Sequence, residues 1–119
     1  MAGRKNRKRA RLGTLVPVLH THYKLEPQYD FGDDTCGLCT SGAVRHIRIS
    51  ATQQDPFPWS ATFWHEFFHA AFFELGFMQD VDSEAKVEGL AHAMMTLLTE
   101  RHGRYLLKDM LKHLPEKQA

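Results

Sequence analysis

Apolar and polar residues alternate along the first half of the chain in the way that is typical of β-strands. In residues 14–26, Val16 and Val18 are apolar anchors spaced two apart, and Pro17 between them limits the segment to a sheet edge or to the start of a strand. We therefore expect a first strand or a loose hairpin in this region.

Residues 44–50 have a more regular strand pattern. Ile47 and Ile49 fall on one side, and the other side carries three polar residues, His46, Arg48 and Ser50. One side of this strand is expected to pack on a helix, while the other meets water. Residues 27–42, which separate the two patterns, are rich in Asp, Gly, Ser and Thr, and this composition predicts a loop.

The second half of the chain changes to helical periodicity. A strongly apolar run covers residues 59–77 and is interrupted by few charged side chains. Pro58 suits the first turn of a helix, and Gly76 suits a C-terminal cap. Because the run is apolar nearly all round, it predicts a buried central helix.

Two further helices are predicted after this one. Asp82 or Ser83 can cap a second helix, which is expected to run to about residue 102 before Gly103 interrupts it. A short third helix is predicted over residues 105–114 and ends at Pro115. The elements together predict an α+β fold, in which a short antiparallel sheet packs on the buried helix.

The composition adds a bound on size and a contrast in charge. The chain has 119 residues, of which 43% are hydrophobic, and this suits a single domain over residues 12–119. Of the 15 Lys and Arg residues, six lie in the first 11 positions. The remaining nine stand against 14 acidic residues, a net charge of −5. The six basic residues are Arg4, Lys5, Arg7, Lys8, Arg9 and Arg11.

Residues 1–11 are expected to be a disordered basic tail. Such a tail can make weak contact with nucleic-acid phosphates, or it can be a solvated terminus without a partner. The second interpretation fits better, because the tail has no aromatic residue to stack on a base. We also expect no membrane association, since no apolar stretch is long enough for a bilayer span.

His65, Glu66 and His69 form an HExxH pentapeptide inside the apolar run. Residues four apart lie on one helix face, so both imidazoles can reach one metal ion while Glu66 faces the water beside it. Burial of the two imidazoles and of the Glu66 and Glu74 carboxylates without partners would be costly, and a metal ion satisfies such groups. The pattern indicates metal-assisted hydrolysis with Glu66 as general base; a pair of satisfied core histidines is the alternative.

A catalytic zinc usually has three protein ligands and an open position. Glu84 and Glu88 lie four apart on the second predicted helix, about 60° and about 100° from the centre of its apolar stripe. Glu84 is therefore expected to be the third ligand and Glu88 to accept a hydrogen bond from a ligating histidine. Two alternatives stay open: Glu88 could be the ligand and Glu84 the hydrogen-bond acceptor, or both carboxylates could lie in solvent on the rim of the helix.

Cys36 and Cys39 form a lone CxxC pair in the predicted loop. Reduced and inert thiols are one interpretation of this pair. A second interpretation is a metal site that also uses His20, His22 or His46. A third is a disulfide between the two cysteines.

The segments HEFFHAAFFELGF and SEAKVEGLAHAMMTLL resemble small phage-encoded metallopeptidases of the minigluzincin kind, relatives of the ImmA/IrrE-type zincins. The resemblance covers residues 15–102. It implies a minimal zincin-like domain with one Zn²⁺ per chain. His65, His69 and Glu84 would be its ligands, Glu66 its general base, and Glu88 an acid that orients a histidine.

The expected function is thus hydrolysis of a peptide bond in a protein substrate by a zinc metallopeptidase. An extended substrate is expected to add to the strand of residues 45–50 as the sheet edge, in contact with His46 and Arg48. His92, Arg104 and Tyr105 are candidates to stabilise the oxyanion. The alternative is a metal-stabilised module without catalysis that binds nucleic acid or a protein partner, for example in phage-host interaction. Either protein is expected in the cytoplasm of a bacterial host.

Overall fold

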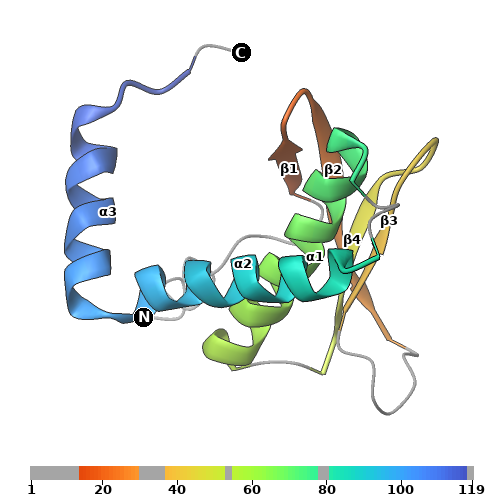
Figure 1. The fold of residues 1–119 in the computed structure, drawn as a ribbon, viewed down its shortest axis with the longest axis horizontal. Coiled ribbons are helices and arrows are strands. Elements are labelled where there is room, and N and C mark those ends of the chain that lie inside the picture. Colours follow the sequence, from red (N-terminus) through yellow and green to blue (C-terminus); the bar gives the residue numbers. More distant parts are fainter. Residues whose placement is uncertain (1–13, 30–36, 53–54, 78–80, 118–119) are drawn as a thin grey trace, which may run out of the picture.

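The computed structural model describes residues 14–29, 37–52, 55–77 and 81–117. Four strands precede three helices along the chain (Figure 1). The strands are β1 (Leu15–Val18), β2 (Thr21–Gln28), β3 (Gly37–Thr40) and β4 (His46–Ser50), and the helices are α1 (Pro56–Leu75), α2 (Ser83–Thr99) and α3 (Arg101–His113). The fold is small, compact and of the α+β class. The expected disordered tail over residues 1–11 lies outside the described residues.

The four strands form one sheet in the order β1-β2-β4-β3. The hairpin of β1 and β2 is antiparallel, as is the pairing of β3 with β4, but β2 and β4 run parallel. The sheet is therefore mixed, and the expectation of an antiparallel sheet is wrong. Two hairpins lie side by side, and the chain crosses over between them, which a pattern of alternating residues does not reveal.

The expectation of a loop over residues 27–42 is also wrong in part. β2 continues to Gln28, and residues 37–40 of the predicted loop form β3 at the edge of the sheet. β3 is only four residues long and begins with a glycine, so its composition resembles that of a turn. The sequence of this edge strand therefore predicted a loop instead of β3.

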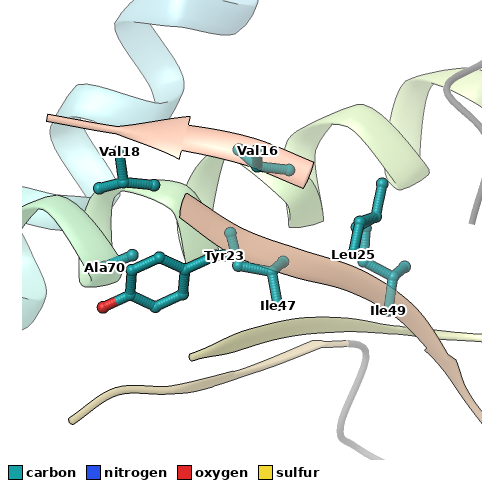
Figure 2. Close-up of a cluster of buried hydrophobic side chains, with 7 residues drawn as sticks. All are labelled: Val16, Val18, Tyr23, Leu25, Ile47, Ile49 and Ala70. Carbon is teal, nitrogen blue, oxygen red and sulfur yellow. The ribbon is translucent and has the colours of Figure 1, made fainter. Parts of the chain in front are cut away.

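The core lies between the sheet and α1 (Figure 2). Alternate residues of three strands point to this layer, and Ala70 of α1 packs onto them because its small side chain lets the helix approach closely. The buried strand residues are Val16, Val18, Tyr23, Leu25, Ile47 and Ile49. Truncation of a fully buried residue such as Ile47 to alanine is expected to cost about 2 to 5 kcal/mol.

The ends of α1 follow local rules. Pro56 is the first residue of the helix, where a backbone N–H would have no partner within the helix, so its absence in proline costs nothing. Gly76 adopts a left-handed conformation with φ 81°, and its N–H donates to the carbonyl of Phe73 at 3.0 Å. The predicted glycine cap is therefore confirmed. The helix is less buried than expected, since its buried residues are only Glu66, Ala70 and Phe72.

A polar network fixes the C-terminal end of α1 on the sheet. The hydroxyl of Tyr23 donates to Oε2 of Glu74 at 2.7 Å, and Nε of Arg45 donates to the same oxygen at 2.8 Å. The Glu74 side chain is only 4% exposed, and Arg45 holds the pKa of this carboxyl below its usual value. Glu74 is therefore satisfied by Tyr23 and Arg45, which corrects the expectation that it needs a metal ion.

The boundary between α2 and α3 lies three residues before the expected position. Glu100 is the one extended residue between the helices, and Gly103 is part of α3 instead of a break. A Cβ atom at position 103 would lie 2.4 Å from the carbonyl oxygen of Leu97, so the glycine allows the close corner. α3 then leads away from the sheet, and its main contacts are with α2 (Figure 1).

Candidate metal centre

The two histidines of the HExxH pentapeptide lie side by side on α1. Their side chains are mostly buried, and their ring centroids are 4.8 Å apart. The Nε2 atoms face each other at 3.2 Å. Lone pairs on two such nitrogens repel unless a proton or a cation lies between them.

Glu84, in the first turn of α2, completes a group of three. Its Oε2 lies 3.1 Å from Nε2 of His65, and its Oε1 lies 2.9 Å from Nε2 of His69. One ligand atom from each of the three residues lies within 4.8 Å of the others. The structure thus brings together the three residues that the sequence proposed as ligands.

The donor set fits zinc in both chemistry and spacing. Imidazole nitrogen and carboxylate oxygen are common zinc ligands, and two ligands bound tetrahedrally at about 2.0 to 2.1 Å lie roughly 3.3 Å apart. In this group the two Nε2 atoms lie 3.2 Å apart, and each faces a different oxygen of Glu84, at 3.1 Å for His65 and 2.9 Å for His69. With one ligand atom taken from each residue, the three atoms lie within 4.8 Å of one another, so a single ion between them would be bound by both Glu84 oxygens or by one of them after rotation of the carboxylate.

Glu88 lies one turn further along α2 and contacts the other side of the His65 ring. Its Oε1 is 3.4 Å from Nδ1 of His65. A carboxylate in this position can accept a hydrogen bond from Nδ1–H, which favours the tautomer in which Nε2 is unprotonated and able to bind a metal ion. This geometry matches the expected roles, in which Glu84 would bind a metal ion and Glu88 would orient a ligand.

Burial favours the neutral form of His69. Desolvation is the largest effect and lowers the pKa of His69, although the nearby Glu84 carboxylate opposes the shift. A lowered pKa keeps the imidazole neutral at neutral pH. Metal binding needs this neutral form.

The side chain of Glu66 lies next to Gly37, the first residue of β3. It is 9% exposed, and burial raises the pKa of its carboxyl, as does the charge of Glu84 to a smaller extent. A Cβ atom at position 37 would lie 3.2 Å from Oε2 of Glu66 and 2.5 Å from Cγ2 of Thr62. Gly37 is thus the residue that lets β3 approach the Glu66 carboxylate, and the sequence offered no signal for this role beyond the glycine itself.

A pocket of about 390 Å³ opens beside Glu66 and His69 along β3. Its other lining residues come from β3, the following turn and the last turns of α1: Gly37, Leu38, Cys39, Ser41 and Phe73. Because β3 pairs only with β4 among the described strands, its other edge is free next to this pocket. The pocket therefore joins the candidate base, one candidate ligand and a free strand edge.

The expectation that residues 45–50 form the sheet edge is wrong. β4 lies between β2 and β3, so its backbone is paired on both sides. His46 and Arg48 contact Glu26 on the neighbouring strand β2, at 3.3 and 3.4 Å. A substrate strand cannot add to β4, so His46 and Arg48 do not lie on a sheet edge that could bind a substrate.

The three candidates for oxyanion stabilisation lie in different places. His92 lines a second pocket of about 340 Å³ between α1 and α2, together with Glu88. Arg104 donates to the carbonyl of Leu98, and Tyr105 is exposed on α3. The structure does not bring Arg104 or Tyr105 to the candidate centre.

Cys39 is a free thiol that packs against the core and contacts Oγ of Ser41 at 3.6 Å. Burial raises its pKa to about 11. At neutral pH it is therefore a protonated, weakly reactive thiol. Cys36 lies outside the described residues, and among those described the one candidate group of three metal ligands is that of His65, His69 and Glu84.

Within the part of the chain that the structure describes, no helix has both the length and the apolar character needed to cross a membrane. Compared with protein-family models, with curated proteins and with solved structures, the chain matches none.

Proposed function

We propose that the chain is a zinc-dependent metallopeptidase of the minigluzincin kind, with one Zn²⁺ held by His65, His69 and Glu84. The observation that carries the proposal is the convergence of three ligand atoms within 4.8 Å on a helix that also bears Glu66. When bound, the ion would supply Lewis-acid polarisation of a carbonyl and activation of water.

Glu66 is the proposed general base. Its raised pKa makes the carboxylate a better proton acceptor than an exposed glutamate, because burial penalises the charged form. It lines the pocket beside His69, where a water molecule and a peptide carbonyl can both enter. In the proposed reaction Glu66 takes a proton from water and passes it to the leaving amine.

The free edge of β3 is the proposed binding site for an extended peptide. An added strand would hydrogen-bond to the backbone of β3 and direct alternate side chains toward the pocket along α1. Because Gly37 begins β3 next to Glu66, a peptide paired with β3 would have its backbone near the general base.

The alternative of a metal-stabilised binding module without catalysis is less well supported. A structural zinc site usually closes its fourth position with another cysteine or histidine and has no use for a carboxylate between its ligands. Among the described residues the group has three members, and Glu66 is buried close by. The resemblance further leads us to propose a phage-encoded protein that acts in the cytoplasm of a bacterial host.

Glu66→Gln tests the proposal, because it keeps the shape of the side chain and removes the base. The zinc-loaded full chain and the variant are incubated with a mixture of unfolded proteins, and new peptide termini are counted by mass spectrometry. We expect equal zinc content and a loss of hydrolysis of at least about 100-fold in the variant. Glu100→Gln, at an exposed carboxylate between α2 and α3, is the matched control and should stay active. Equal hydrolysis in Glu66→Gln, or none in zinc-loaded wild type, would favour the binding module.

A further inference from the structure

The pocket of about 390 Å³ beside Glu66 and His69 is also lined by Phe73. These three residues of α1 are spaced three and four positions apart, so their side chains share one side of the helix. β3 lies along that side, because Gly37 approaches Glu66 and Cys39, two residues further on, lines the same pocket. The candidate base and the Phe73 ring therefore belong to one pocket between α1 and β3.

The register of β3 shows which side chain of an added strand would enter this pocket. Gly37 and Cys39 are the Cα partners of Ile49 and Ile47, whose side chains are buried in the core. Opposite residues of a strand pair point to the same side of the sheet, so Gly37 and Cys39 also face α1. A peptide residue beside Cys39 on the free edge would face the same way, two residues from the one beside Gly37. Its side chain would enter the pocket next to Phe73.

The chemistry of the lining favours an apolar side chain in this place. Beyond the candidate base and the candidate ligand, the described residues that line the pocket are uncharged. The Ser41 hydroxyl already contacts the hydroxyl of Tyr23 at 2.7 Å, and the Cys39 thiol is protonated at neutral pH because burial raises its pKa to about 11. The Phe73 ring is 42% exposed. An apolar side chain would cover this ring without losing a hydrogen bond of its own.

Charged side chains suit the pocket less well. An anionic side chain would be repelled by the ionised carboxylate of Glu66. The charge of Glu74 reaches Cys39, but this carboxylate is only 4% exposed and is paired with Arg45 at 2.8 Å. A cationic side chain would thus have Glu66 as its partner and would compete for it with the water and carbonyl of the proposed reaction.

We propose that the pocket selects an apolar side chain of a peptide strand added to β3, and that Phe73 determines this selectivity. The selected residue would lie beside Cys39, two residues from the one that passes Glu66 at Gly37. The substrates would be extended segments with apolar side chains, such as an unfolded protein exposes. The inference rests on the proposed function of the same site, but peptide binding and hydrolysis can be measured separately.

Binding of blocked octapeptides of serine and threonine with one variable central residue tests the proposal. The full chain carries Glu66→Gln and is loaded with zinc, so that it should not cleave the peptide, and NMR titration gives the dissociation constants. We expect the leucine peptide to bind at least about tenfold more tightly than the alanine or the lysine peptide, because only leucine buries a large apolar side chain.

Substitution of Phe73 in the same chain tests the determinant of selectivity. Phe73→Ala should reduce the preference for leucine over alanine to about threefold or less, since the ring that covers the bound side chain is lost. Phe73→Leu should restore most of the preference. Leu75→Ala is the matched control, because Leu75 is 51% exposed on α1 and does not line the pocket. Circular dichroism melts should show that all three variants fold, since both positions are partly exposed.

The outcomes separate the pocket from the peptidase. Equal binding of the leucine and alanine peptides, tightest binding of the lysine peptide, binding of none, or a leucine preference that Phe73→Ala leaves intact would each overturn the proposal. Hydrolysis of the same peptides by the zinc-loaded wild type is scored separately. Selective binding without hydrolysis would support the pocket and contradict the proposed peptidase, whereas hydrolysis without a preference for leucine would contradict the pocket alone.

Discussion

Glu88 and His65 are joined by a contact of 3.4 Å between Oε1 and Nδ1, on the side of the imidazole ring that does not face Glu84. Nε2 of the same ring lies 3.1 Å from Oε2 of Glu84. Two carboxylates one turn apart on α2 therefore contact opposite nitrogens of one histidine. In the proposed metal centre these positions give the two carboxylates different roles, and this difference can be measured.

Glu84→Ala should abolish stoichiometric zinc binding, because it removes one of three ligands. Glu88→Ala should keep one zinc per chain with an affinity about 10 to 100-fold lower, since it removes only the group that orients His65. Competition with a chromogenic chelator gives both affinities, and Glu100→Ala serves as the control for loss of an exposed carboxylate. A larger loss in Glu88→Ala than in Glu84→Ala would show that the two roles are exchanged.

Gly37→Ala should destabilise the protein and reduce any hydrolysis. The new methyl group would meet Cγ2 of Thr62 at 2.5 Å and Cγ of Glu66 at 3.0 Å, so β3 must move away from α1. Overpacking of this kind costs about 1 to 3 kcal/mol. Urea unfolding of the variant measures the change.

Gly89→Ala is the matched control for this substitution. Position 89 lies within α2 and has nothing within 4 Å of the added Cβ. Alanine there should stabilise the helix by about 0.5 to 1 kcal/mol. If Gly37→Ala were as harmless as Gly89→Ala, β3 would not lie as close to Glu66 as we describe.

The Glu74 network predicts a dependence of stability on acid pH. The hydrogen bond from Arg45 is the largest cause of the lowered pKa of Glu74, followed by that from Tyr23. A lowered folded pKa gives a contribution that is present above the unfolded value of 4.5 and is lost as the pH falls through the folded pKa. Wild type should therefore lose stability in acid more steeply than Glu74→Gln.

Denaturant midpoints of the metal-free chains between neutral and acid pH measure this difference. Tyr23→Phe should lower stability by about 1 to 3 kcal/mol at neutral pH, because it removes a hydrogen bond to a buried carboxylate. Parallel pH curves for wild type and Glu74→Gln would contradict the network.

The candidate site was largely predictable because it depends on helical spacing. His65 and His69 are four residues apart on one helix, so they share a face. Glu84 lies close to the apolar stripe of the next helix, which predicted that its side chain faces the interior. Both facts follow from periodicity within a single element. Burial of Glu66 was expected from the apolar run around it, but the approach of Gly37 to its carboxylate could not be predicted in the same way, since Gly37 belongs to a strand that lies far away in the sequence.

The sheet was less predictable, because pairing between strands is not encoded in alternation. The pattern of Ile47 and Ile49 correctly gave one buried side, but it could not show that β4 has neighbours on both edges. The contact between Tyr23 and Glu74 spans 51 residues and likewise has no local signal. Glu100 instead of Gly103 ends α2, because the glycine serves the close corner with Leu97.

Zinc content per chain, measured by plasma mass spectrometry on the purified full chain, tests the central claim most directly. The account predicts one zinc in wild type, one in Cys36→Ala and none in His65→Ala. A wild-type protein without zinc, or zinc that is lost with Cys36 and kept without His65, would contradict it.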